Sequence, residues 1–344
     1  MQEILPAITA LIPYLEGKKI LLVRGGSFDS LPIRAAFEGL ECVHFTGFAP
    51  NPLYEQVAEG VRVFQREGCD AIVAVGGGSA MDVAKCIKLF CRMDPARNYL
   101  EQPYEDTGVL LAAVPTTAGS GSEATRHAVI YYQGTKQSIS HKSIVPSLAV
   151  LEPSVLESLP AYQKKCTMMD SLCQAIESWW SVNACEESIA YSKAAIKLIV
   201  DNWEEYILGG AARATNACSA AIMKAANLSG RAINITATTA AHAMSYKITS
   251  LYGIPHGHAV AICLAQVWEH MLGMAPRLDD IARIIDLDYF RGMLSRMGLD
   301  GPVSAHREED IAVLASSVNP VRLKNNPVPL TEVQLKSLYE RIIK

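Results

Sequence analysis

The sequence lacks the features that mark membrane, secreted or nucleic-acid-binding proteins. No apolar run approaches the roughly 20 residues needed to span a bilayer. The N-terminal stretch MQEILPAITALIPYLEGKK carries acidic residues and no basic segment before its apolar part, so it does not have the pattern of a signal peptide. A net charge of −4 gives no basic surface for nucleic acid. We therefore expect a cytoplasmic protein with a small-molecule partner, and neither a nucleic acid nor a membrane partner.

Paired cysteine motifs are also missing. The nine cysteines are odd in number and include no C-x-x-C pair, which favours reduced, mostly buried thiols. Half of the 344 residues are hydrophobic and 19% are charged, as in a well-packed enzyme. The length is large for a single core and predicts two domains.

The first half of the chain alternates strand and helix patterns, which predicts an α/β domain with a parallel sheet. The expected strands are Lys18–Val23, Glu41–Phe45, Cys69–Val75, Gly108–Val114 and Ser147–Leu151, and the expected helices are Leu31–Leu40, Pro50–Glu67 and Ala80–Phe90. A hairpin is expected over 128–140. No convincing strand follows, and from Pro160 onward the pattern is helical, with helices expected over Ala211–Ile235, Asp279–Arg296 and Glu332–Ile343.

Two glycine-rich segments follow strands of the first half. Gly76, Gly77, Gly78 and Ser79 come directly after the third strand and open a helix. Glycine lets the backbone approach a ligand, and a helix N-terminus offers free N–H groups, so this turn has the composition of a phosphate cradle. It is neither a G-x-G-x-x-G fingerprint nor a P-loop, and a tight strand–helix turn is the plainer alternative. Pro115–Glu123 is the second segment, rich in hydroxyl groups and glycine.

The second half carries two groups of possible metal ligands. Asp170, Gln174 and Glu177 are spaced along one face of an expected helix. Asp170 and Gln174, one turn apart, would be costly to bury without partners, and either a metal or ordinary helix–helix hydrogen bonds would satisfy these two. The stretch 238–261 holds three of the eight histidines. His242 lies in a run of small residues, and His256 lies at a turn that opens an apolar helix. Two imidazoles fixed by separate rigid elements favour a metal pocket, although a lone histidine is more often a packed core residue.

Together these segments resemble the iron-containing (group III) alcohol dehydrogenase family. The resemblance is carried, in order, by VGGGSAMDVAK, VPTTAGSGSEAT, LEPSVLESLP, MDSLCQAIES, HAMSYKITSLYGIPHGHAV and NPVPLTE. It implies a dehydroquinate synthase-like architecture, in which an N-terminal dinucleotide-binding α/β domain (1–155) precedes an all-α metal domain (156–344). It also implies a cofactor cleft between the domains and a homodimer.

The resemblance also implies a metal site for one divalent ion, Fe2+ or Zn2+. The family's pattern is an aspartate, a histidine four residues later, and two histidines fourteen residues apart. Asp170, His242 and His256 match it, whereas Gln174 stands at the position of the first histidine. An amide oxygen is a weaker ligand for these ions than imidazole. Tyr246 stands where many members carry a histidine near the nicotinamide, and with His242 it is the expected catalytic residue.

On the cofactor side, the resemblance assigns residues of three segments to dinucleotide binding: Gly25, Ser27, Gly76, Gly77, Gly78, Ser79, Asp82, Thr116, Thr117 and Ser120. Members that prefer NAD often carry an aspartate after the first strand, where this chain has Gly25 preceded by Arg24. A missing carboxylate beside an arginine favours a 2′-phosphate, so NADP(H) is expected over NAD(H).

The expected activity is metal-dependent, NAD(P)H-linked reduction of a small aldehyde. The sequence, with Gln174 in place of the usual histidine, resembles the phosphonoacetaldehyde reductase branch of the family, whose members make 2-hydroxyethylphosphonate. Lys247, Arg126, His127, His141 and Lys142 are candidates to bind the anionic group, although each is also compatible with a solvated surface charge. Two alternatives remain open, a lyase or cyclase of the dehydroquinate-synthase type and a metal-free nucleotide-binding relative.

Overall fold

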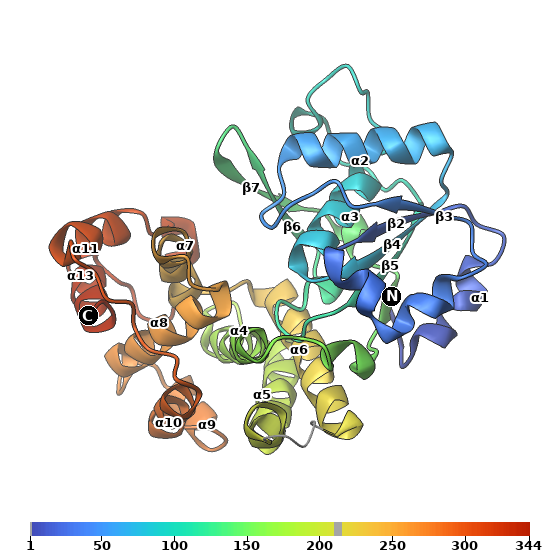
Figure 1. The fold of residues 1–344 in the computed structure, drawn as a ribbon. Coiled ribbons are helices and arrows are strands. Elements are labelled where there is room, and N and C mark those ends of the chain that lie inside the picture. The colour runs from blue at the N-terminus through green and yellow to red at the C-terminus, as the bar shows by residue number, and fades with distance from the viewer. Residues whose placement is uncertain (1, 210–214) are drawn as a thin grey trace. The chain divides into compact units, whose positions relative to one another are not determined.

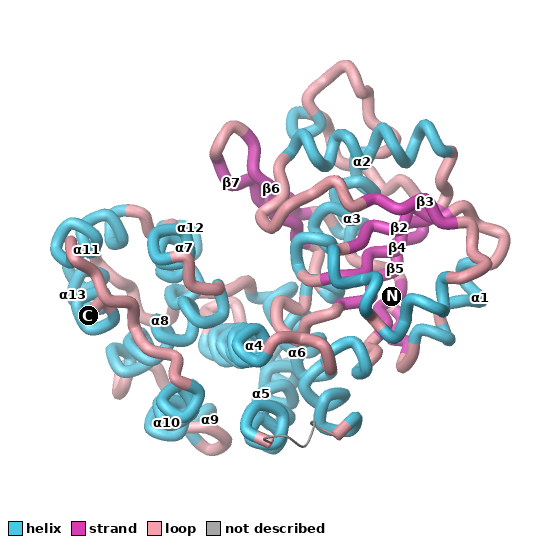
Figure 2. Tube along the Cα trace, in the orientation of Figure 1, coloured by secondary structure: helices cyan, strands magenta, loops and turns pink. Residues whose placement is uncertain are grey.

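A computed structural model describes residues 2–209 and 215–344 of the chain. The chain forms two compact units, Met1–Leu159 and Pro160–Lys344. Among the described residues, the strands gather in the first unit and the second unit is helical (Figure 2). The expected boundary between residues 155 and 156 falls inside the short helix η7 (Pro153–Leu156), just before this division. No described helix has the length and apolar character that crossing a membrane requires.

The first unit is built on a six-stranded parallel sheet with the strand order β1-β8-β5-β4-β2-β3. Its strands are β1 (Glu3–Leu5), β2 (Ile20–Arg24), β3 (Cys42–Phe45), β4 (Ala71–Gly76), β5 (Leu110–Pro115) and β8 (Leu148–Val150). The expected parallel sheet is confirmed, and β2 and β4 are buried at nearly every position. β1 was not expected, because three residues carry too little pattern to distinguish a strand. It is held by pairing with β8 at the edge of the sheet.

Helices α2 (Tyr54–Glu67) and α3 (Gly78–Phe90) pack against each other and against this sheet, on the side opposite α1 (Ile12–Leu15) (Figure 1). The two helices come close at Gly60, where a Cβ atom would lie 2.4 Å from Ile87 Cδ1. The hairpin expected over 128–140 is confirmed as β6 (His127–Tyr132) and β7 (Thr135–Ser140). Further short helices in this unit are η1 (Ile8–Ala10), η4 (Tyr99–Glu101), η5 (Ser122–Ala124) and η6 (Lys142–Ile144).

The helix expected over Leu31–Leu40 is wrong. The chain forms two 3-10 segments there, η2 (Gly26–Ser30) and η3 (Pro32–Phe37). Leu31, which precedes a proline, is extended at φ −79° and ψ 141°. A residue before proline is disfavoured in the helical region, and proline has no N–H to donate, so the helix cannot run through this point.

The second unit is a helical assembly around buried tryptophans. Its helices are α4 (Ala161–Trp180), α5 (Glu186–Leu208), α6 (Asn216–Thr236), α7 (Ala240–Tyr252), α8 (His256–Met271), α9 (Arg277–Ala282), α10 (Leu287–Met297), α11 (Arg307–Ser316), α12 (Pro320–Leu323) and α13 (Glu332–Ile342). Residues 211–214 of the helix expected over Ala211–Ile235 lie outside the described residues. Trp180, Trp203 and Trp268 are at most 1% exposed and lie among the helices of this core.

The single helix expected over Asp279–Arg296 is wrong, because the segment divides into α9 and α10. Asp286 ends the interruption by accepting a hydrogen bond from the backbone N–H of Tyr289 (2.8 Å), which caps α10. Thr331 is the N-cap of the last helix, where its hydroxyl accepts from the N–H of Gln334 at 3.3 Å.

Candidate metal centre and glycine-rich turns

Three side chains from three helices of the second unit meet at one point. Asp170 comes from the middle of α4, His242 from the first turn of α7 and His256 from the first residue of α8. Asp170 Oδ1 lies 3.3 Å from His242 Nε2 and 3.9 Å from His256 Nε2. One potential ligand atom from each side chain lies within 4.8 Å of the others. The three ligands expected from the family pattern are therefore together in space.

This cluster has the ligand types of a cation site, and two of its buried polar atoms make no hydrogen bond to any residue that the structure describes. Asp170 Oδ1 and His242 Nε2 are both buried and have no hydrogen-bond partner among the described residues. Buried polar atoms are normally satisfied, and leaving them unsatisfied is costly. Two ligands on a tetrahedral ion with bonds of about 2.1 Å lie about 3.4 Å apart, close to the separation of these two atoms. The residues present therefore fit a divalent ion.

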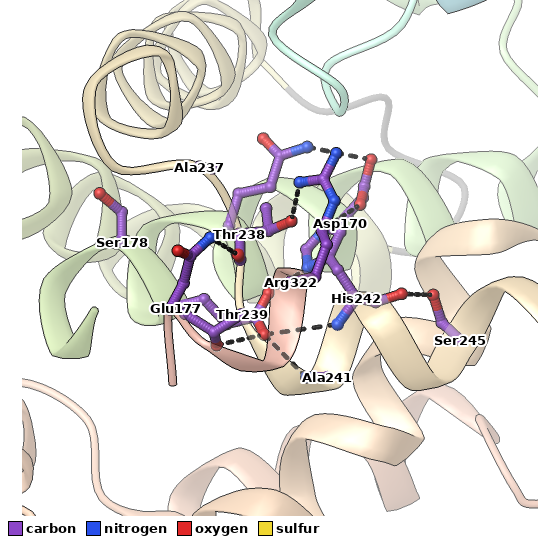
Figure 3. Close-up of polar contacts among 12 residues, drawn as sticks. Asp170, Glu177, Ser178, Ala237, Thr238, Thr239, Ala241, His242, Ser245 and Arg322 are labelled. Atoms are coloured by element: carbon purple, nitrogen blue, oxygen red, sulfur yellow. Dashed lines mark hydrogen bonds and ion pairs between the residues drawn. The ribbon is translucent and has the colours of Figure 1, made fainter. Parts of the chain in front are cut away.

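Glu177 orients the His242 ring through Nδ1, the ring nitrogen that does not face Asp170. One carboxylate oxygen, Oε1, accepts hydrogen bonds from Thr239 Oγ1 (2.6 Å) and the backbone N–H of Ala241 (2.8 Å). The other, Oε2, contacts His242 Nδ1 (Figure 3). A carboxylate on Nδ1 fixes the ring and its tautomer and directs Nε2 away, toward Asp170. The sequence placed Glu177 on the face of Asp170 but assigned it no role; its one signal was its seven-residue spacing from that aspartate.

Electrostatic contacts in this cluster oppose the effect of burial. Burial alone would raise the pKa of the Glu177 carboxyl, but the adjacent His242 imidazole holds that pKa below its usual range. The pKa of Asp170 is lowered in the same way, against burial, by His242 and His256. Burial alone would lower the pKa of His242, but Glu177 and Asp170 raise it to about 9. The site is thus arranged to hold positive charge between its carboxylates.

Gln174 lies one turn beyond Asp170 on α4 and is buried. Its Nε2 donates to Asp170 Oδ2 at 3.4 Å, and its Oε1 accepts from Ser229 Oγ of α6 at 3.1 Å. The residue that replaces the family's usual histidine thus faces the proposed ligand cluster.

His256 is held at the cluster by close contact between α8 and α4. A Cβ atom on Gly257 would lie 1.9 Å from the backbone oxygen of Cys166 and 3.0 Å from Asp170 Cβ, so only glycine allows this approach. The Tyr246 ring stacks on the His256 imidazole, with ring centres 5.5 Å apart and planes 2° apart.

Two side chains near the cluster are accounted for by other contacts. Both ring nitrogens of His258 are engaged, one with the Tyr162 hydroxyl (2.8 Å) and the other with the Asp300 carbonyl (2.9 Å), so it is not available as a ligand. The thiol of Cys173 is fully buried, and burial raises its pKa well above the usual value, as expected for a packing residue.

In the first unit, the two glycine-rich segments lie against each other. Gly76 ends β4, and its carbonyl accepts from the N–H of Thr116 (3.0 Å) at the end of neighbouring β5. A Cβ atom on Gly77 would lie 3.6 Å from Thr117 Cγ2, and one on Gly78 would lie 3.6 Å from Ser120 Oγ. The carboxyl ends of adjacent parallel strands, beside a helix N-terminus, are where phosphate groups bind in such sheets.

A buried lysine that the sequence did not single out ties these two segments together. Lys85 of α3 is completely buried, and its ammonium contacts Ser122 O (2.6 Å), Ser122 Oγ (3.0 Å), Thr125 Oγ1 (3.1 Å) and His127 O (2.8 Å). Burial lowers the pKa of Lys85 to about 8 despite the nearby carboxylate of Asp82. Asp82 accepts a long hydrogen bond from Ser122 (3.4 Å), and burial raises its pKa to about 6.

Arg24 at the end of β2 is not an isolated cation. Its Nε donates to His44 Nδ1 (2.8 Å), and its Nη1 contacts the Asp29 carboxylate at 3.0 Å. Its guanidinium also lies over the Phe28 ring. Gly25 and Ser27 follow it at the start of η2. Asp29 supplies a carboxylate that the sequence pattern near Gly25 did not anticipate, because it lies on the turn rather than directly after the strand.

The candidates for binding an anionic substrate group divide between the two units. Lys247 follows Tyr246 on α7 and is half-buried. Arg126, His127, His141 and Lys142 flank the ends of the β6–β7 hairpin in the first unit, where His141 N–H donates to the Arg126 carbonyl at 3.1 Å.

Family models match both halves of the chain. The model described as "Iron-containing alcohol dehydrogenase" matches residues 3–153, and "Fe-containing alcohol dehydrogenase family, C-terminal" matches residues 165–343. The chain belongs to the iron-containing alcohol dehydrogenase family. It is therefore an oxidoreductase of this family, whose members use NAD(H) and a divalent metal. This assignment favours the dehydrogenase interpretation over the lyase alternative.

Individual family members show the same likeness. A 1,3-propanediol dehydrogenase of Klebsiella pneumoniae is 33% identical over 292 residues, covering 79% of this chain and 73% of that protein. A phosphonoacetaldehyde reductase of Streptomyces viridochromogenes is 33% identical over 234 residues, covering 62% and 56%. The crystal structure of a sulfoacetaldehyde reductase from Bifidobacterium kashiwanohense in complex with NAD+ superposes with a TM-score of 0.89 at 27% identity, covering 99% of this chain and 96% of that one.

Proposed function

We propose that this iron-type alcohol dehydrogenase reduces a small aldehyde that carries an anionic group, with phosphonoacetaldehyde, reduced to 2-hydroxyethylphosphonate, as the first candidate. The observation that carries the metal-dependent chemistry is the convergence of Asp170 Oδ1 and His242 Nε2, two buried atoms left without a hydrogen bond, next to His256. We assign the ion to Asp170, Gln174, His242 and His256.

The choice of substrate class rests on two relatives. One is named for phosphonoacetaldehyde and the other for sulfoacetaldehyde. Both aldehydes are two-carbon compounds that end in a tetrahedral oxyacid group, so they differ little in shape or in the sign of their charge. An enzyme for either needs a cation near the reacting carbonyl. Lys247 is our candidate, because it is half-buried and adjacent to Tyr246 on the helix that carries His242.

The chain's own residues prepare the site for this reaction. When bound, a divalent ion polarises the carbonyl oxygen of the substrate, and a reduced nicotinamide supplies the hydride that reaches its carbon. Glu177 keeps Nδ1 of His242 engaged, so that Nε2 faces the ligand cluster. Tyr246, whose ring is fixed on His256, is our candidate to donate the proton that the product oxygen takes up. The first unit would hold the dinucleotide on Gly76–Ser79, Thr116, Thr117 and Ser120, with Gly25, Ser27 and Asp82 beside them.

We propose NADP(H) as the preferred cofactor because Arg24 places a guanidinium at the end of β2, beside Gly25 and Ser27. A 2′-phosphate would compete with Asp29 for this cation. Arg24→Ala should therefore lower the NADPH/NADH ratio of kcat/KM about tenfold, whereas Asp29→Ala should raise it. An unchanged ratio in both variants would remove the basis for this preference.

The decisive test is the oxidation of NADPH and NADH by the protein reconstituted with Fe(II) or Zn(II). Phosphonoacetaldehyde, sulfoacetaldehyde and propanal would be compared as substrates. We expect the two anionic aldehydes to exceed propanal in kcat/KM, and Lys247→Met to remove most of that advantage while leaving propanal turnover unchanged. Equal or better turnover of propanal would refute the anionic substrate and leave the family assignment in place. Sedimentation of the same sample would test the expected homodimer.

A further inference from the structure

The start of α7 departs from the usual way in which a threonine caps a helix. Thr239 is the N-cap residue of α7, but its hydroxyl accepts no hydrogen bond from the residues of this helix, all of which the structure describes. A threonine at this position normally accepts from the second or third N–H of the helix. Here those two N–H groups, of Ala241 and His242, donate instead to Glu177 Oε1, at 2.8 Å and 3.3 Å. A carboxylate from α4 therefore caps α7, where the helix dipole favours a negative charge, and the Thr239 hydroxyl is left for another contact.

The direction of the Thr239 hydroxyl is set by its two neighbours. Trp180 Nε1 can only donate, and it donates to Thr239 Oγ1 at 2.9 Å. Thr239 in turn donates its single hydroxyl proton to Glu177 Oε1 at 2.6 Å, a separation typical of a hydrogen bond from a hydroxyl to a carboxylate. Trp180, Thr239 and Glu177 are all fully buried, so water does not offer any of them an alternative partner.

These contacts give the two oxygens of Glu177 different roles. Oε1 accepts from the Thr239 hydroxyl and from two backbone N–H groups of α7, whereas Oε2 contacts His242 Nδ1 (Figure 3). A carboxylate held at one oxygen by three donors cannot rotate without breaking those hydrogen bonds. The position of Oε2, and with it the orientation of the His242 ring, therefore depends on what holds Oε1. The Thr239 hydroxyl is the one of these three donors that a side-chain substitution removes.

We infer that Thr239 is a positioning residue of the metal site, which acts through Glu177 to hold the His242 imidazole with Nε2 directed at the ion. This inference rests on the proposed metal site and extends it by one contact beyond Glu177. A residue type that caps helices, whose hydroxyl donates to a second helix instead, is a local exception of the kind expected at functional sites. Valine has nearly the volume of threonine and lacks the hydroxyl, so Thr239→Val removes this donor with little change in packing.

The test is calorimetric titration of the chelator-stripped full-length protein with Zn2+. Thr239→Val should weaken Zn2+ binding about tenfold, at the lower end of the range for partners that orient a metal ligand, because Thr239 acts through Glu177. Thr239→Ser keeps the hydroxyl and should bind Zn2+ as the unsubstituted protein does. Thr239→Cys, whose thiol is a weak donor, should give a smaller loss and replaces the valine variant if that one does not fold.

The matched control is Thr236→Val, the same change in a threonine three residues earlier that is 1% exposed. The Thr236 hydroxyl donates to Ser178 Oγ (2.9 Å) and to the Ala237 carbonyl (2.8 Å) rather than to a residue of the metal cluster. Thr236→Val should therefore leave the Zn2+ affinity unchanged. An equal loss of affinity in both valine variants would show that packing alone is responsible, and would overturn the inference. Thermal unfolding of each metal-free variant checks that the fold is retained.

A spectroscopic measurement separates positioning from a general loss of stability. The visible absorption of bound Co2+ depends on the arrangement of its ligands, and at saturating Co2+ it does not depend on the affinity. Thr239→Val should shift the Co2+ bands, whereas Thr239→Ser and Thr236→Val should leave them in place; identical spectra for Thr239→Val and the unsubstituted protein overturn the inference. Failure of the unsubstituted protein to bind Zn2+ or Co2+ overturns the proposed metal site, and this inference with it. Zn2+ binding that Thr239→Val and Thr239→Cys do not weaken overturns this inference alone.

Discussion

Replacing Gly257 by alanine tests the contact that brings His256 to Asp170. The added Cβ would lie 1.9 Å from the backbone oxygen of Cys166 and 2.8 Å from its carbonyl carbon. Contacts of a Cβ below 3.0 Å are essentially never seen. The obstructing atoms belong to the backbone of α4, so a rotamer change cannot relieve them. The start of α8 would have to move away from α4 by about 1 Å.

Two consequences follow from this displacement. Overpacking of a well-packed core costs about 1–3 kcal/mol, and the backbone obstruction places Gly257→Ala near the upper end, at about 3 kcal/mol. His256 precedes the substituted residue and would move with it, away from Asp170 Oδ1, which lies 3.9 Å from its Nε2. A ligand misplaced by about 1 Å can reduce turnover on the order of a hundredfold.

The matched control is Gly292→Ala, in the middle of α10. No atom lies within 4 Å of a Cβ placed there, and its φ is not in the left-handed region. Alanine at such a helix position should stabilise the protein by about 0.5–1 kcal/mol. Urea unfolding of metal-free protein would measure both variants without a contribution from bound metal. Equal midpoints for Gly257→Ala and the unsubstituted protein, or unchanged metal affinity, would refute this account of the site.

Three further substitutions have outcomes that the structure specifies. Glu177→Gln should weaken metal binding by a factor of about 10–100, measured by calorimetry, because His242 loses the carboxylate that orients it. Lys85→Met should destabilise the protein by about 3 kcal/mol in urea unfolding and raise KM for the dinucleotide more than it lowers kcat, because four oxygens around the buried ammonium lose their donor. Burial lowers the pKa of His258 despite the Asp300 carbonyl, so below pH 6.5 the unfolded chain takes up a proton that the folded protein resists. The free energy of unfolding should therefore fall as the pH decreases below 6.5, and less steeply in His258→Gln; parallel curves for the two proteins would contradict this assignment.

The sequence predicted most of what depends on local pattern. Buried parallel strands such as β4 appear as short apolar runs, and the turn at Gly76 marks where β4 ends. The approach of His242 and His256 to Asp170 was expected only because the motifs match a family pattern. Periodicity alone placed these residues on helices without saying which helices meet.

The features that the sequence did not predict depend on contacts between distant segments. Glu177 and His242 are 65 residues apart, and nothing in the sequence around either residue indicates that their side chains would contact each other. In the sequence, Lys85 is indistinguishable from an ordinary lysine on a helix. Only the structure shows that its ammonium contacts Ser122 and the residues near it. A charged side chain in an apolar helix was the available signal for that lysine, since a buried cation requires partners.

The pairing of β1 with β8 has a consequence for how the first unit is assembled during synthesis. Glu3 is paired with Leu148, and in the part of the chain that the structure describes β8 is the only strand beside β1 in the sheet. A chain that emerges from the ribosome N-terminus first therefore presents β1 long before its partner exists. Until β8 arrives, β5 also remains an open edge, available for pairing with another nascent chain. The sheet closes through its most non-local contacts, which predicts that their formation limits the folding rate of this unit.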